Sequence, residues 1–243
     1  MRVWKHFHAL LVLCLLLETA SGQQQQGSAV VSTTIREDIF AGLLAGDLER
    51  VNVRMDKTRE ALKHDPSSSG SLAWLAGGEL VLAVHAYEAH KISDFNAHYQ
   101  AAVRYFDDAE RVGSTNAGVY DISGAMWDNL GDRLPASLRA SAFENAYRSF
   151  ETALKMNQDR LATMNRHGLG EILTGIAHSA QRTGRADETR QRLLQMAALL
   201  PGTIFEERSH RWLAEPELIA KTSVACQSCH PQERFSAVTT KSR

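Results

Sequence analysis

Residues 158–203, QDRLATMNRHGLGEILTGIAHSAQRTGRADETRQRLLQMAALLPGT, have the pattern of two helices joined by a tight turn. The first half is rich in glycine and alanine, and the second half has the pattern of an amphipathic helix. The segment GRAD (184–187) separates the two halves, and Pro201 ends the second, because proline cannot continue a helix. The stretch therefore predicts a helical hairpin.

Similar hairpins are predicted further toward the N-terminus. The helix pairs are expected to begin near Thr34, Ser69, Thr115 and Asp159. Each turn carries an aspartate that can cap the second helix, namely Asp47, Asp94, Asp132 and Asp187. Small residues are expected to let helices pack closely at Ala61, Ala109, Ala153, Gly77 and Gly170. The aromatic residues expected to pack helices together are Trp74, Trp127 and Trp212.

Residues 34–213 resemble the tetratricopeptide repeat family, and residues 158–203 carry the resemblance best. The resemblance implies an all-α array of helix-turn-helix units that stack into a superhelix with a concave docking surface. The units here are longer than the family's usual ~34 residues. An irregular helical bundle is the alternative fold.

The N-terminus has the pattern of a secretory signal peptide over residues 1–22. Arg2 and Lys5 precede nine apolar residues (9–17), and the small Ala20 and Gly22 follow at the expected cleavage site. Cleavage after Gly22 would remove Cys14 and leave a glutamine-rich flexible leader over residues 23–33. We therefore expect a periplasmic or otherwise exported protein with no membrane span in the mature chain.

The two remaining cysteines lie in CQSCH (226–230), within a C-terminal tail expected over residues 214–243. C-x-x-C-H is the attachment signature of c-type haem. The motif resembles that of cytochromes c, which implies that Cys226 and Cys229 add to the two vinyl groups of one haem c. The same resemblance makes His230 the axial ligand of the iron.

Three other uses of the sulfurs remain open. A disulfide between Cys226 and Cys229 would close a very short loop, so its entropic stabilisation would be small. A thioredoxin-like pair needs a strand before the motif, and a structural zinc site needs four ligands. Neither requirement is visible in the sequence.

The second axial ligand is not fixed by the sequence. No Met or His follows His230, so the ligand must come from the helical region or from a partner, or the position stays open. The candidates are His210, His167, His178 and Met164. Gly168 and Gly170 would permit close approach of a flat ring. A c-prime-type cytochrome bundle, supported by Arg234 four places after the histidine, is an alternative haem fold.

Together these patterns predict an exported electron-transfer protein with one haem on a helical-repeat scaffold and a redox partner protein that docks on the repeats. The alternatives are a repeat-type adaptor with a disulfide at the motif, and a five-coordinate binder of small ligands. The sequence lacks nucleophile-elbow and phosphate-loop motifs, and the small net charge of −1 gives no indication of nucleic-acid binding. No enzymatic activity is expected, and His85, His90 and His98 are interpreted as ordinary surface histidines.

Overall fold

The computed structural model of the protein describes residues 35–221. Within this range the chain is helical with no strand, which confirms the all-α prediction. Residues 35–45 form a helix that pairs with α2 (Leu48–His64). The next pairs are α3 (Ser69–Glu88) with α4 (Ile92–Val112), α5 (Ala117–Leu130) with α6 (Ala136–Met156), and α7 (Arg166–Arg182) with α8 (Ala186–Leu199).

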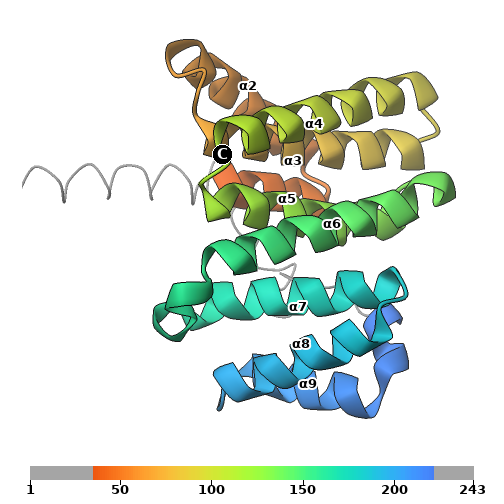
Figure 1. The fold of residues 1–243 in the computed structure, drawn as a ribbon. Helices are drawn as coiled ribbons and strands as arrows, with labels where there is room; N and C mark the ends of the chain where they lie inside the picture. Colours follow the sequence, from red (N-terminus) through yellow and green to blue (C-terminus); the bar gives the residue numbers. More distant parts are fainter. Residues whose placement is uncertain (1–34, 222–243) are drawn as a thin grey trace, which may run out of the picture.

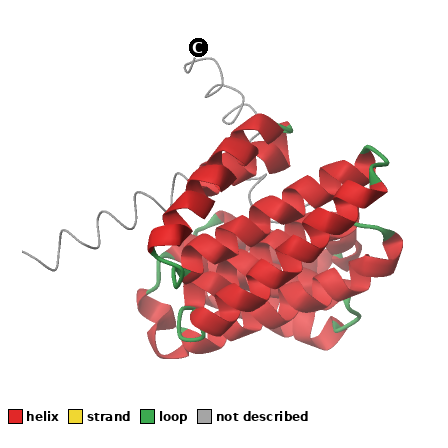
Figure 2. Ribbon diagram, turned by 90° about the horizontal axis from the view of Figure 1, so that it is seen from above, coloured by secondary structure: helices red, strands yellow, loops and turns green. Residues whose placement is uncertain are grey.

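The chain continues into α9 (Ile204–Ala214) and three short 3-10 helices complete the described elements. These are η1 (Gly131–Arg133), η2 (Gln158–Thr163) and η3 (Pro216–Lys221). Figure 1 shows the hairpins stacked in a row from α2 to α9, and Figure 2 looks down this stack from above. The arrangement is the helical-hairpin array that the sequence predicts.

Backbone conformation explains where the hairpins turn. Gly46 and Gly184 have φ of 70° and 80°, a left-handed conformation that glycine adopts without strain, and both lie in predicted turns. The sequence places the turn between α3 and α4 at Asp94, but the turn lies earlier, where His90 takes φ of 59°. Ile92 is already the first residue of α4.

Helix capping follows the prediction only in part. Asp47 accepts a hydrogen bond from the Arg50 backbone N–H at 3.1 Å and caps α2. Asp94 and Asp187 lie instead inside the first turns of α4 and α8, where a negative charge interacts favourably with the helix dipole. Asp132 lies in η1 and pairs with a distant arginine described below.

The core consists of two main clusters that meet at α6. Residues from Ile35 to Ala146 form the first, and residues from Phe150 to Ile219 form the second. The predicted small contacts at Ala109, Ala153, Gly77 and Gly170 are buried, whereas Ala61 is exposed. All three predicted tryptophans are buried in the core, Trp74, Trp127 and Trp212.

Candidate functional site

Three polar pairs lie along the seam between α5 and α7. The pairs are Asp121 with Glu171, Asp128 with His178, and Asp132 with Arg182. In each pair the partners are 50 residues apart. A constant separation means that the two helices run in the same direction, as the first helices of successive hairpins do in a repeat array.

The middle pair is the most deeply buried. The side chains of Asp128 and His178 are 1% and 3% exposed, and Asp128 Oδ1 lies 2.8 Å from His178 Nδ1. The Nδ1–H group donates to the carboxylate, so the bond fixes both the orientation of the imidazole and its protonated nitrogen. Two aromatic rings flank the imidazole, with ring centroids 5.7 Å away for Phe143 and 6.4 Å away for Trp212.

Several polar atoms of this neighbourhood are buried without a hydrogen-bond partner. They are His178 Nε2, Asp128 Oδ2 and Trp212 Nε1. Buried polar atoms are paired in most proteins, because leaving one unpaired costs about 1–3 kcal/mol. The imidazole therefore bonds to Asp128 through one nitrogen, while its other nitrogen is buried without a partner.

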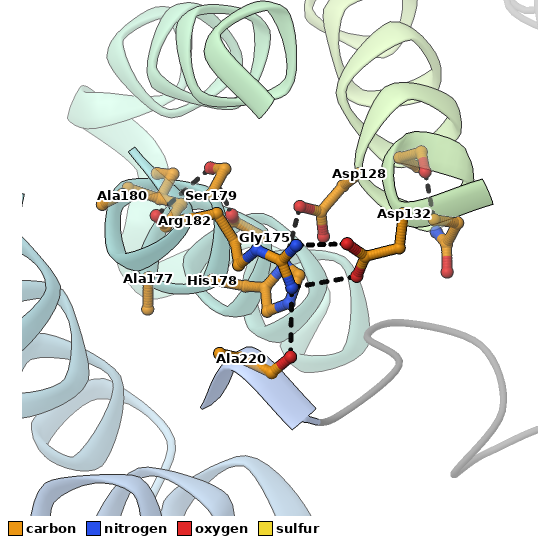
Figure 3. A network of polar contacts seen from close by, with 12 residues as sticks. Asp128, Asp132, Gly175, Ala177, His178, Ser179, Ala180, Arg182 and Ala220 are labelled. Atoms are coloured by element: carbon orange, nitrogen blue, oxygen red, sulfur yellow. Dashed lines mark hydrogen bonds and ion pairs between the residues drawn. The ribbon is translucent and has the colours of Figure 1, made fainter. Parts of the chain in front are cut away.

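The third pair links the seam to the end of the described chain (Figure 3). Arg182 Nη1 donates to Asp132 Oδ2 at 2.9 Å and to the Ala220 carbonyl at 3.0 Å. The Arg182 guanidinium also lies over the Phe143 ring, 4.3 Å from its centroid. Ile219 beside Ala220 is fully buried, so η3 packs against the repeats and contacts α7 and α9.

The first pair brings two carboxylates together. Withdrawal from water and the nearby Glu171 raise the pKa of Asp121 from 3.8 to about 7, while Arg36 opposes the shift. His167 Nε2 lies 3.1 Å from Glu171 Oε1 at the same end of the seam. Asp121 is half-buried there, and with this raised pKa its carboxyl group titrates near neutral pH.

The predicted haem-attachment residues Cys226, Cys229 and His230 lie outside the described residues, as do the signal peptide and leader predicted for 1–33. The predicted tail begins at residue 214, and its described part, which includes η3, packs on α7 and α9. Among residues 35–221, none of the helices has the length and apolar character needed to cross a membrane.

The four candidates for a second axial ligand differ sharply in environment. His210 is exposed on α9, His167 contacts Glu171, and Met164 packs against the second core cluster. His178 combines deep burial with an unpartnered ring nitrogen. Gly170 does not leave room for a haem, because a Cβ there would lie 2.3 Å from Phe205 Cδ2 and the phenyl ring fills the space.

The three histidines interpreted as ordinary surface residues have different surroundings. His98 Nδ1 lies 2.7 Å from Glu79 Oε2, and His85 Nε2 lies 3.3 Å from the Gly42 carbonyl. His90 is exposed in the turn after α3. Within the described range, no group of three or more His, Cys, Asp or Glu residues is arranged to hold a metal ion.

Sequence reasoning identified His178 but missed its partners. The signal was present as two matching spacings, D-x6-D-x3-D at 121–132 and E-x6-H-x3-R at 171–182. Positions seven and four residues apart share one face of a helix. The matching spacings become informative only once α5 and α7 are known to be parallel neighbours.

In comparisons with known proteins, no family model matches the chain and the search of curated proteins gives no match.

Proposed function

We propose that this protein is an exported, c-type-cytochrome-like electron-transfer protein that carries one haem c on Cys226 and Cys229, with His230 as an axial ligand. The motif CQSCH carries the proposal, because it holds both cysteines left after signal-peptide cleavage. The N-terminal export pattern supports it, since c-type haem is attached outside the cytoplasm in bacteria.

The chain's own residues would hold the cofactor in a simple way. Cys226 and Cys229 would each hold the haem through one vinyl group, with sulfur bonded to one vinyl carbon and the thiol hydrogen on the other. His230 would hold the iron through a ring nitrogen. When bound, the haem would supply a couple that accepts and releases single electrons.

Anchoring of the tail supports a haem held near the repeats. Cys226 follows Lys221, the last described residue, by five positions, and extended chain of that length reaches at most about 18 Å. Arg182 and the buried Ile219 hold the residues just before this segment against α7. A haem on the motif would therefore lie beside the last two hairpins, and a partner could dock on the stacked helices.

The test is the mass of the intact, denatured mature protein after expression with a c-type haem maturation system. We expect the mass of the polypeptide plus one haem, and loss of that increment in a Cys226→Ala, Cys229→Ala double variant. A polypeptide mass lower by two hydrogens would mean a disulfide. That result would overturn the proposal in favour of a repeat-type adaptor.

A further inference from the structure

We propose that His85, Glu88 and Arg133 form a pH-sensitive clasp, which joins the first three hairpins at neutral pH and loosens the third in acid. His85 and Glu88 lie in the last turn of α3, and Arg133 lies in η1, between α5 and α6. They meet the end of the helix before α2 at the carbonyl groups of Gly42 and Leu43. The inference concerns the repeats alone, so it goes beyond the proposed function and does not depend on haem.

Arg133 is the centre of the clasp at neutral pH. Its Nε and Nη2 groups donate to the two oxygens of Glu88, each at 2.8 Å. Its Nη1 group donates to the Leu43 carbonyl oxygen at 3.3 Å, and its Nη2 lies 3.3 Å from His85 Nε2. One guanidinium group of the third hairpin therefore contacts both the first and the second hairpin.

The Nε2 atom of His85 lies between a donor and an acceptor. Arg133 Nη2 can only donate a hydrogen bond, whereas the Gly42 carbonyl oxygen, also 3.3 Å from Nε2, can only accept one. A neutral imidazole with its lone pair on Nε2 accepts from Arg133, while Gly42 keeps its bond from the Gly46 backbone N–H at 3.1 Å. An imidazolium can donate to Gly42 but cannot accept from Arg133. The presence of a proton on Nε2 therefore decides which neighbour His85 binds.

The surroundings of His85 favour its neutral form. Burial and the charge of Arg133 lower the pKa of His85 from its ordinary value of 6.5, against opposing effects of the Gly42 carbonyl and Glu88. The side chains of His85 and Arg133 are 23% and 28% exposed, so solvent protons reach the site while the two groups still sense each other. The stability that neutral His85 provides is complete above pH 6.5 and is lost as the pH falls below it.

Protonation of His85 produces a different set of contacts. The imidazolium donates from Nε2 to the Gly42 carbonyl oxygen, and its Nδ1, 3.9 Å from Glu88 Oε2, attracts that carboxylate. Two cations then share Glu88 and repel each other across the 3.3 Å between His85 Nε2 and Arg133 Nη2. Acid therefore keeps α3 joined to the helix before α2 but weakens the contacts that hold Arg133 and η1.

The other charged groups near the clasp are paired elsewhere or exposed. Asp132 on η1 bonds to Arg182 on α7 (Figure 3), and Asp38 on the first helix pairs with two arginines of α2. His90 and Lys91, beyond the end of α3, are exposed. Within the described part of the chain, the charges that shift the pKa of the imidazole are those of the two other clasp residues.

Hydrogen–deuterium exchange of the full mature chain, at about pH 7.5 and about pH 5, tests the clasp. Exchange is followed in the peptide that covers η1, corrected for the intrinsic effect of pH, and expressed relative to α8 of the same protein. His85→Gln removes the titrating group and keeps a neutral side chain that forms hydrogen bonds. His64→Gln, exposed at the end of α2, is the matched control.

We expect acid to raise the exchange of η1 by about threefold or more in wild type and in His64→Gln, because the imidazolium repels Arg133. His85→Gln should show no such rise. Exchange in residues 35–45 should stay level or fall in wild type, because the imidazolium donates to the Gly42 carbonyl. Unchanged exchange of η1 in wild type, or an equal rise in His85→Gln, would overturn the inference.

Arg133→Leu provides a second test, which does not require His85→Gln to fold. Without the guanidinium group, the carbonyl of Gly42 and the carboxylate of Glu88 still favour the imidazolium. Titration of the His85 ring by nuclear magnetic resonance should therefore give a higher pKa in this variant than in wild type. An unchanged pKa would show that Arg133 does not act on the imidazole and would overturn the clasp.

Discussion

Two buried carboxylates in the same array differ in how many of their oxygens form hydrogen bonds. Glu79 on α3 bonds through both oxygens, with Arg59 Nη2 at 2.6 Å and His98 Nδ1 at 2.7 Å. Asp128 on α5 bonds through one oxygen, to His178 at 2.8 Å, and its other oxygen has no partner.

The difference separates a fully paired network from one that keeps buried polar atoms without partners. The Glu79 network joins α2, α3 and α4, and its partners reach partly into solvent, where their exposed fractions are 38% and 36%. The Asp128–His178 pair is closed to solvent on both sides yet unsatisfied. Each unpaired polar atom buried in this pair costs stability that a fully paired network does not lose.

The largest contrast is expected between matched acid-to-amide changes in the haem-free Cys226→Ala, Cys229→Ala protein. Glu79→Gln should lower the free energy of unfolding by about 3 kcal/mol, because it removes a buried charge that pairs with Arg59 and bonds to His98. Asp128→Asn should cost about 1 kcal/mol, because the amide oxygen keeps the bond to His178. Urea unfolding measures both, and equal losses would remove the distinction between the two sites.

A second contrast tests how rigidly α7 holds its histidine. A Cβ at Gly175 would lie 2.2 Å from Phe150 Cε2, so Gly175→Ala should destabilise the protein by about 2 kcal/mol through overpacking. Gly168 on the same helix has nothing within 4 Å of a Cβ. Gly168→Ala should therefore stabilise by about 0.5 kcal/mol. A tolerated Gly175→Ala in thermal unfolding would mean that α7 and α6 are packed more loosely than the contact indicates.

The third test uses pH at the other end of the seam. The pKa of Asp121 is raised to about 7 from 3.8, so between these values the folded state binds more protons than the unfolded state. Stability should therefore fall as pH rises from about 4 to about 7 and level off above that, and Asp121→Asn should remove this part of the slope. Unfolding midpoints of both proteins across the range measure it, and parallel curves would contradict the raised pKa.

The smallest effect is expected at an exposed ion pair. Arg185 and Glu144 join α6 to the turn before α8 at 2.9 Å, with exposed fractions of 33% and 52%. Glu144→Ala should change stability by less than about 0.5 kcal/mol, because water screens the pair. A loss comparable to that of Glu79→Gln would show that burial does not determine how much each carboxylate contributes to stability.

The sequence predicts the hairpins well where the local signal is strong. Glycine marks the turns at Gly46 and Gly184, and Pro66 follows the end of α2. The α3–α4 turn is placed too late because His90 takes a left-handed conformation, which residues other than glycine adopt uncommonly. The local sequence pattern does not indicate this conformation.

The candidate site is predicted less completely for a different reason. His178 is recognisable from the sequence as one of several histidines, but what sets it apart is its bond to Asp128, 50 residues away. That pairing requires α5 and α7 to be parallel neighbours in one register, which follows from the stacking of whole hairpins. Residue spacing within one helix cannot supply it.

The most direct test is the intact mass of the denatured mature protein, made beside the Cys226→Ala, Cys229→Ala protein in a c-type haem maturation system. We expect the wild-type chain to carry the mass of one haem and the double variant to carry none. A wild-type mass that shows the polypeptide alone would contradict a haem held by CQSCH.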